Sequence, residues 1–304
     1  MHETRGISSA AVALVRFSRP HTIVGTVLSL VGLSAIAAAE PGVAFSLPRL
    51  LSAIVSALGV NVFVVGLNQI TDVPIDKINK PELPLASGAM GRASAWFATL
   101  LGLVVAILVA VSQGKFLLIA ILLAASIGAV YSLEPVRIKR FPFWAGTSIA
   151  SVRGVVVNLF IFLHFSANSP SPAGIPTKIW VLTGVVLGLS LVIAWYKDIP
   201  DMAGDQRYGI WTFSRRLGAK RVVQLGAFLL SICYLSVVAA GWFGLPGVNP
   251  GVLIVSHLAL LAAFWAATRR VDLADPASVR SFYLFVWGLF FAEYLAFPAA
   301  CLLA

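Results

Sequence analysis

Apolar stretches long enough to cross a lipid bilayer recur throughout this 304-residue chain. A helix needs about 20 mostly apolar residues to span the hydrocarbon core, because it rises about 1.5 Å per residue. Inside the bilayer a helix satisfies every backbone polar group within the span itself. The stretches cover residues 22–39, 48–70, 93–112, 115–132, 143–165, 178–196, 223–243, 250–268 and 281–302. The sequence therefore predicts an all-α membrane protein of about nine transmembrane helices.

The composition supports this fold class. Hydrophobic residues make up 59% of the chain and charged residues 11%, whereas soluble domains carry about 25% charged residues. The net charge of +10 does not indicate a nucleic-acid partner, because the cations lie in short segments between apolar stretches instead of on one soluble face. Cys233 and Cys301 lie inside apolar stretches without metal or disulfide spacing, so we expect them to be buried. We also expect His164 and His257 to be packing residues.

The cations predict the orientation of the helices. With nine spans, the N-terminal segment and the 2–3, 4–5, 6–7 and 8–9 connections share one side, and they hold 18 of the 22 Lys and Arg residues. Cation-rich loops remain in the cytoplasm, so the N-terminus is expected there, in a bacterial inner membrane or a cyanobacterial thylakoid membrane. A cleaved signal peptide is the alternative for the first stretch, but the charge distribution also fits a retained helix.

We expect residues 1–304 to form a single integral-membrane domain. A weak internal repeat is visible, with two four-helix blocks at about 20–140 and 141–270 followed by a ninth helix. An Asp-rich segment follows the second helix of each block, which resembles the repeats of other membrane proteins.

The first Asp-rich segment spaces Asn68, Asp72 and Asp76 four residues apart. On a helix this spacing brings all three side chains to one face. Because proline disrupts helices, we expect Pro74 to end the regular helix and to leave Asp76 in a loop.

The second Asp-rich segment contains Asp198, Asp201 and Asp205, so the two segments hold five of the seven Asp residues in the chain. Five carboxylates at one membrane face would repel each other without a cation. Hard oxygen ligands suit Mg²⁺, which binds through a few carboxylates and the phosphates of a substrate. The spacing lacks the ligand order of a calcium-binding EF-hand. The predicted metal ligands are Asp72, Asp76, Asp198, Asp201 and Asp205.

Cations on the same side are candidates to pair with phosphate oxygens that no metal holds. The segment 131–140 is the strongest candidate, because three cations follow the end of the fourth span there. The candidate diphosphate-binding residues are Lys77, Lys80, Lys139, Arg140, Lys197 and Arg207.

Arg153 lies within the fifth span, roughly 15 Å deep at about 1.5 Å per residue. An ionisable group at that depth is costly and usually lines a cavity. Arg153 is suited to the carboxylate of a second substrate, with Asn158 nearby on the same helix. A structural ion pair with Glu293 or Glu134 is the alternative.

At these residues the chain resembles the UbiA-type intramembrane prenyltransferases, and within them the homogentisate prenyltransferases of tocopherol and plastoquinone synthesis. Four stretches carry the resemblance: residues 19–22, 68–88, 131–140 and 197–218. The resemblance implies nine helices around a central cavity, capped on the cytoplasmic side by the two Asp-rich segments. It also implies Mg²⁺-dependent transfer of a prenyl group, phytyl or geranylgeranyl, from its diphosphate to homogentisate with loss of carbon dioxide.

By position, the resemblance assigns the catalytic roles to Asn68, Asp72, Asp76, Asp198, Asp201 and Asp205. We expect the aromatic acceptor to contact Tyr131, Arg153 and Asn158. The chain departs from many relatives at Pro135, which occupies the place of a Lys four residues after the tyrosine matching Tyr131. The cation that activates the leaving group is therefore left open by the sequence.

Two alternatives belong beside this interpretation. The first is another acceptor, such as a hydroxybenzoate, a chlorophyllide, haem or a glycerol phosphate. The second is a transporter with acidic sites, although a transporter would place its acids near the bilayer midplane. Here the Asp residues lie at the ends of spans beside cations, which favours a phosphate ligand.

Overall fold

The computed structural model describes residues 11–167, 174–207 and 211–304, apart from the side chains of residues 203–205. Within these residues nine helical segments are long and apolar enough to cross a membrane, and no strand is present. The predicted fold class is therefore confirmed, and the chain is an integral, multi-pass membrane protein. The division into one domain with two four-helix blocks stays a prediction.

The membrane helices follow the predicted stretches closely. They are α2 (Pro20–Ala38), α3 (Leu47–Asn79), α4 (Arg92–Gln113), α5 (Lys115–Ser132), a fifth span made of α6 (Pro142–Ala150), η2 (Ser151–Ile161) and α7 (Phe162–Ser166), α8 (Thr177–Lys197), α11 (Ala219–Trp242), α12 (Pro250–Thr268) and α13 (Pro276–Leu302). Three short elements lie between them: η1 (Ile138–Arg140), α9 (Met202–Arg207) and α10 (Phe213–Leu217).

Local sequence explains where several helices begin. Proline occupies the first or second position of α2, α3, α6, α12 and α13, where its missing N–H costs no helical hydrogen bond. Side chains of Ser46, Asn249 and Asp275 accept hydrogen bonds from the first backbone N–H groups of α3, α12 and α13.

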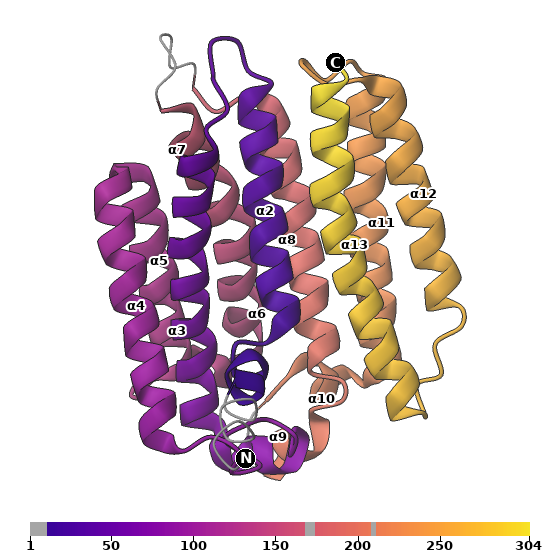
Figure 1. The fold of residues 1–304 in the computed structure, drawn as a ribbon. Helices are drawn as coiled ribbons and strands as arrows, with labels where there is room; N and C mark the ends of the chain where they lie inside the picture. The colour runs from indigo at the N-terminus through magenta and orange to yellow at the C-terminus, as the bar shows by residue number, and fades with distance from the viewer. Residues whose placement is uncertain (1–10, 168–173, 208–210) are drawn as a thin grey trace, which may run out of the picture.

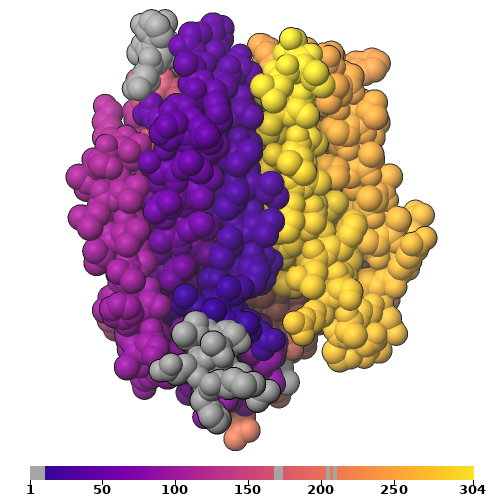
Figure 2. Space-filling model, viewed as in Figure 1, coloured from indigo at the N-terminus to yellow at the C-terminus, as the bar shows by residue number. Residues whose placement is uncertain are grey.

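Six elements form a ring around the interior of the protein. Going round, α2 packs against α3, α3 against α5, α5 against η2, η2 against α8, α8 against α13, and α13 returns to α2. Figure 2 shows α2 alongside α13 on one face of the molecule. Outside the ring, α4 packs against α3 through Gly59 and Gly102, where an added Cβ on Gly59 would lie 2.5 Å from the Gly102 carbonyl oxygen.

The prediction that Pro74 ends its helix is wrong. Pro74 lies inside α3, which continues to Asn79 and carries Asp76 as a helical residue. Ile75 and Asp76 are buried, and the backbone N–H of Lys80 bonds to the Asp76 carbonyl at 2.8 Å. Packing and this hydrogen bond stabilise the last turns, so the single bond that proline removes is tolerated.

The two ends of the protein differ in chemistry. The start of α2 lies at the same end as α9 and α10, whereas the C-terminus lies at the opposite end (Figure 1). At that opposite end, buried Lys178 pairs with Glu40 at 2.6 Å and donates to the Gly247 carbonyl at 3.2 Å. Both Asp-rich segments lie at the end that holds α9, α10 and the start of α2. This is the cation-rich end, as the charge distribution predicted.

We expect the cation-rich end to face the cytoplasm and Ala304 to face the other side, because cation-rich loops are retained in the cytoplasm. A reporter that is active only in the cytoplasm should work when inserted at the exposed Gly88, in the 2–3 connection, and should fail when fused after Ala304. A reporter that is active only after export should give the reverse. Activity of one reporter at both positions would contradict this topology.

Candidate functional site

A small polar cavity of about 60 Å³ lies at the cation-rich end, between the ends of α3, α5 and α8. It brings together the two Asp-rich segments, which are far apart in the sequence. Its charged lining residues are Arg19, Asp72, Asp76, Lys80, Lys139, Lys197, Asp198 and Asp201. The predicted convergence of the two segments is therefore observed for the described side chains.

The length of α3 positions the first segment. At about 1.5 Å per residue, its 33 residues extend about 50 Å, well beyond the roughly 30 Å hydrocarbon core. Asn68, Asp72 and Asp76 lie on one face of its C-terminal part, and the Asn68 amide donates to Asp72 at 2.9 Å. The carboxylates consequently lie near the aqueous edge of the membrane while the rest of the helix remains apolar.

The second segment follows α8 directly. Asp198 occupies the position after the last helical residue, Lys197, and Asp201 lies in the turn before α9. Asp201 is buried, and its carboxylate accepts a hydrogen bond from Lys80 beyond the end of α3. This ion pair connects the two Asp-rich segments.

Further ion pairs balance Asp72 and Asp198. Lys139 of η1 pairs with Asp72, and Arg137 reaches the same carboxylate at 3.1 Å. Lys197 pairs with the neighbouring Asp198 at 3.3 Å. Burial lowers the pKa of Lys139 and raises the pKa of Asp198, each relative to its ordinary value. Because the cavity is poorly solvated, its charges act strongly on any ligand that enters.

The donor set of this cavity fits a hard divalent cation. Four carboxylates, at Asp72, Asp76, Asp198 and Asp201, provide the oxygen ligands that Mg²⁺ prefers. Among the described side chains, however, no three His, Cys, Asp or Glu residues converge closely enough to hold a metal by themselves. The site therefore fits an ion that completes its coordination with the phosphate oxygens of a ligand.

A second, larger cavity of about 250 Å³ lies inside the ring, and all six ring elements contribute to its lining. Arg19, Asn68, Tyr131 and Lys197 line both cavities, so the charged space continues directly into the apolar one. This arrangement suits an amphiphilic molecule with an anionic head and a hydrocarbon tail.

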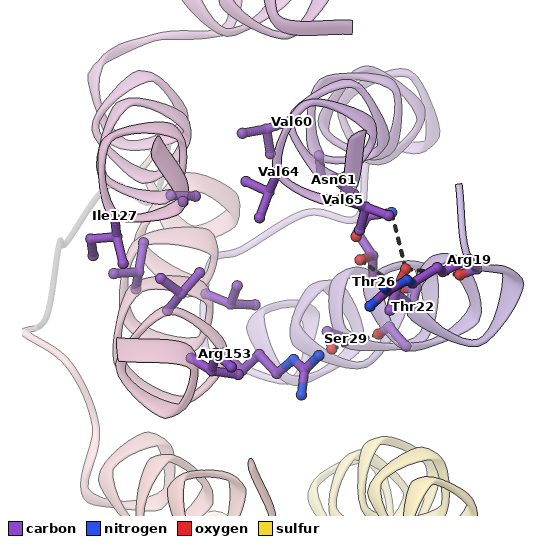
Figure 3. Close-up of a pocket in the computed structure, with 18 of the residues that line it drawn as sticks. Arg19, Thr22, Thr26, Ser29, Val60, Asn61, Val64, Val65, Ile127 and Arg153 are labelled. Atoms are coloured by element: carbon purple, nitrogen blue, oxygen red, sulfur yellow. Dashed lines mark hydrogen bonds between the residues drawn. The ribbon is translucent and has the colours of Figure 1, made fainter. Parts of the chain in front are cut away.

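The walls of the larger cavity differ in polarity (Figure 3). Val60 and Val64 of α3 and Ile127 of α5 form an aliphatic wall. Across from them, Thr22, Thr26 and Ser29 of α2 present hydroxyl groups, and Asn61 of α3 donates to Thr22 at 3.2 Å. The cavity can thus accept a hydrocarbon chain on one side and a polar ring on the other.

Arg153 projects into this cavity from η2 and reaches toward α2 (Figure 3). Its guanidinium lies 4.5 Å from the ring centroid of Trp287, and Nη1 is buried without a hydrogen-bond partner among the described residues. Neither proposed acidic partner contacts it: Glu293 pairs with His257 at 3.2 Å, and Glu134 pairs with Arg137 and Arg140. The structural ion pair, the alternative interpretation of Arg153, is therefore not formed in the described part of the protein.

The conformation of η2 is a feature that the sequence did not reveal. Residues Ser151–Ile161 form a π-helix, a rare wider form that is found mostly at functional sites. Gly154 packs so closely on Leu187 of α8 that an added Cβ would lie 2.6 Å from its Cγ. The widened turn and this close packing fix the helix that carries Arg153.

Some predicted site residues lie elsewhere. Lys77, Arg140 and Arg207 are exposed and line neither cavity, whereas Asn158 is buried and accepts a hydrogen bond from Tyr294 at 2.5 Å. Asp205 belongs to α9, but its side chain is outside the described part. The roles assigned to these residues stay predictions.

Sequence reasoning assigned no role to Arg19, although the stretch 19–22 carried part of the family resemblance. Arg19 lines both cavities and has a left-handed backbone conformation, with φ of 53°. Arg137 is also left-handed, with φ of 43°. Positive φ is costly for residues other than glycine and occurs often at functional sites. No periodicity or spacing in the sequence signals such a conformation.

Comparisons with known proteins agree with this geometry. Residues 27–289 match the model of the UbiA prenyltransferase family. The chain is 43% identical to homogentisate phytyltransferase of Synechocystis sp., over 95% of each protein, and 35% identical to homogentisate geranylgeranyltransferase of Triticum aestivum, over 96% of this chain and 73% of that one. A solved structure of a UbiA homolog from Archaeoglobus fulgidus, bound to GPP and Mg²⁺, has the same fold, with a TM-score of 0.66 at 17% identity over 94% of this chain and 99% of that one.

The ion pairs of the polar cavity predict a stability effect. Asp72→Asn leaves buried Lys139 without its closest counter-ion, and breaking a buried pair costs about 3–5 kcal/mol. We expect the free energy of unfolding to fall by an amount near the lower end of this range, because other acids remain near Lys139. Adding Lys139→Met should restore part of the loss, since the uncompensated charge is then removed. Unfolding in detergent measures both effects.

The exposed acid Glu82, at the same end of the protein, provides the control. Glu82→Gln should change stability little, because exposed pairs contribute about 0–1 kcal/mol. An Asp72→Asn protein as stable as the Glu82→Gln protein would contradict the importance of this pair.

Proposed function

Because this chain belongs to the UbiA prenyltransferase family and is a prenyltransferase, we propose that it transfers a phytyl group from phytyl diphosphate to homogentisate with loss of carbon dioxide. The continuity between the charged cavity and the apolar cavity carries this proposal. The names of the two relatives above support homogentisate as the acceptor, and the cyanobacterial relative supports phytyl as the donor group. Family membership removes the transporter alternative.

We place the diphosphate of the donor in the polar cavity and its tail along the aliphatic wall. A hydrocarbon tail gains about 0.8 kcal/mol for each CH₂ that it buries, so the apolar cavity favours the tail strongly. The charged head remains near the aqueous edge, where Lys139, Lys197 and Arg19 can donate to its oxygens. The four residues shared by both cavities then surround the bond that breaks.

We propose Mg²⁺ as the cofactor, held by Asp72, Asp76, Asp198, Asp201 and Asp205 together with phosphate oxygens. When bound, the ion would neutralise charge on the departing pyrophosphate. The Mg²⁺ bound to the Archaeoglobus fulgidus homolog supports this choice, as do the hard oxygen donors of the polar cavity.

The chain's own residues direct the reaction. As the prenyl C–O bond breaks, its electron pair goes to the pyrophosphate, and the cations of the polar cavity stabilise that charge. Tyr131 lies at the junction of the two cavities, where its ring can face the developing allylic cation. The apolar walls exclude water, which would otherwise capture that cation. The acceptor ring supplies the electrons for the new C–C bond.

We assign the acceptor carboxylate to Arg153. A carboxylate that enters an apolar cavity without a partner loses several kcal/mol of hydration. Arg153 offers a guanidinium with an unpaired Nη1, held over Trp287 at the right depth. Hydroxyl groups of Thr22, Thr26 and Ser29 face the same side and suit the phenolic groups of the ring.

We further propose that the site opens to the cytoplasm, in a bacterial inner membrane or a cyanobacterial thylakoid membrane. The cation-rich loops around the polar cavity support this orientation. Both water-soluble components, homogentisate and released pyrophosphate, would then exchange on the cytoplasmic side.

Purified protein should convert homogentisate and phytyl diphosphate to prenylated methylquinol when Mg²⁺ is present, as read by product mass. Geranylgeranyl and solanesyl diphosphates, and a hydroxybenzoate as acceptor, complete the panel. EDTA or Asp198→Ala should reduce turnover to near background, whereas Asp272→Ala, an exposed acid of the 8–9 connection, should not. Normal turnover in EDTA would contradict the Mg²⁺ assignment, and preference for another acceptor would contradict the assignment of homogentisate.

Arg153→Leu should raise the KM for homogentisate about 10-fold to 100-fold and leave the KM for the prenyl diphosphate nearly unchanged. A hydrogen bond to a charged group contributes about 1.5–3 kcal/mol, and about 1.4 kcal/mol corresponds to a factor of ten. The KM of Arg153→Lys for homogentisate should lie between those of the wild-type protein and Arg153→Leu, because lysine keeps the charge but loses bidentate binding. A larger effect on the donor KM, or loss of folded protein in both variants, would favour a structural role.

A further inference from the structure

Substitution on an aromatic ring requires a base, because the ring carbon that gains the prenyl group must lose its proton. The described lining of the apolar cavity contains no Asp or Glu side chain. Its cations, Arg19, Arg153 and Lys197, already carry their protons, and Lys197 is paired with Asp198. Serine, threonine and tyrosine hydroxyls are weak bases. Among the described lining residues, an imidazole is therefore the remaining candidate for this base.

His21 is the one imidazole among the described residues that line this cavity. It is the second residue of α2, and its ring meets Trp287 edge-on with a centroid distance of 5.1 Å. Both ring nitrogens lack hydrogen-bond partners within the described part of the protein, so they remain available to a ligand. An imidazole can accept a proton at one nitrogen and later donate it.

Trp287 relates His21 to the proposed acceptor site. Its indole contacts the His21 ring, and the Arg153 guanidinium lies 4.5 Å from the centroid of the same indole. An acceptor whose carboxylate is held by Arg153 would therefore present its ring near His21. The remaining charged neighbour of His21 is Arg19, which faces the polar cavity as well.

We propose that His21 is the catalytic base that takes the ring proton of the acceptor after the prenyl group has been attached. This inference rests on the proposed function, because it requires an aromatic acceptor held by Arg153. It adds a residue that neither Asp-rich segment contains.

The bonds and protons balance. The prenyl C–O bond breaks with its electron pair going to pyrophosphate, and the ring provides the pair for the new C–C bond. The ring C–H bond then breaks, its electrons return to the ring, and the proton passes to a His21 nitrogen. Loss of carbon dioxide leaves an electron pair on the side-chain carbon, which takes up one proton. Because one proton is released and one is consumed, His21 can return the same proton and needs no external acid.

The test compares His21→Gln and His21→Ala with His164→Gln. His164 is buried in α7 and lines neither cavity, so its variant should retain the wild-type kcat. General-base catalysis contributes about 100-fold to 10,000-fold, so both His21 variants should lose kcat by such a factor. The KM for homogentisate should change less than twofold, in contrast to Arg153→Leu. A His21 variant within threefold of the wild-type kcat would overturn the proposal.

Two further readouts separate a base from a packing residue. Ring-deuterated homogentisate should show a primary isotope effect on kcat in His21→Gln, because cleavage of the ring C–H bond becomes rate-limiting. Added imidazole should restore at least tenfold activity to His21→Ala. A loss of kcat with neither an isotope effect nor rescue would overturn the proposal, and either variant suffices if the other fails to fold.

The acceptor panel distinguishes this inference from the proposed function. If the wild-type protein uses another aromatic acceptor, the assignment of homogentisate fails while the same His21 comparison is made with that acceptor. If homogentisate is turned over normally by the His21 variants, the proposed function stands and the base assignment fails.

Discussion

The pairing of acids with cations at the cation-rich end is the interaction on which the site depends. Asp72 and Asp201 are buried, and an unpaired carboxylate in such a place would lose several kcal/mol of hydration. Lys139 and Lys80 compensate them from segments that follow two different helices. These pairs order η1 and the turn after α8 around the end of α3. The same charges that stabilise the loops are therefore already arranged around a cavity that fits a phosphate.

Polarity changes in a defined order along the path into the protein. The outer cavity carries acids and cations, the junction carries Arg19, Asn68, Tyr131 and Lys197, and the inner cavity is mostly aliphatic. A prenyl diphosphate has the same order of polarity from head to tail, so each part of it would meet a lining of matching polarity. Arg153 departs from this order, and its buried Nη1, which has no hydrogen-bond partner among the described residues, is the basis for proposing a second anionic ligand.

Most of the fold follows from the sequence, because apolar length and loop charge are local properties. The spans agree with the predicted stretches within a few residues except where α3 continues through Pro74 to Asn79 and where α11 and α13 begin earlier. The continuation of α3 past Pro74 arises from tertiary packing of Ile75 and Asp76, which the sequence does not display. The convergence of the Asp-rich segments was also predictable, since charge placed both at one end. The ion pair between Lys80 and Asp201, the position of Arg19 and the π-helix were not predictable, because they depend on where loops fold back and how helices pack.

The inner cavity illustrates this dependence on packing. Gly25 of α2 allows α13 to approach so closely that an added Cβ would lie 3.1 Å from the Trp287 ring and 3.3 Å from Phe290. Since His21 precedes Gly25 by one helical turn, the same contact places the Trp287 ring beside the imidazole. The Trp287 ring also contacts the guanidinium of Arg153, which comes from η2. One missing side chain on α2 thus determines how closely the imidazole and the guanidinium approach each other. The proposed roles of the guanidinium in holding the acceptor and of the imidazole in deprotonating it both depend on this close helix contact.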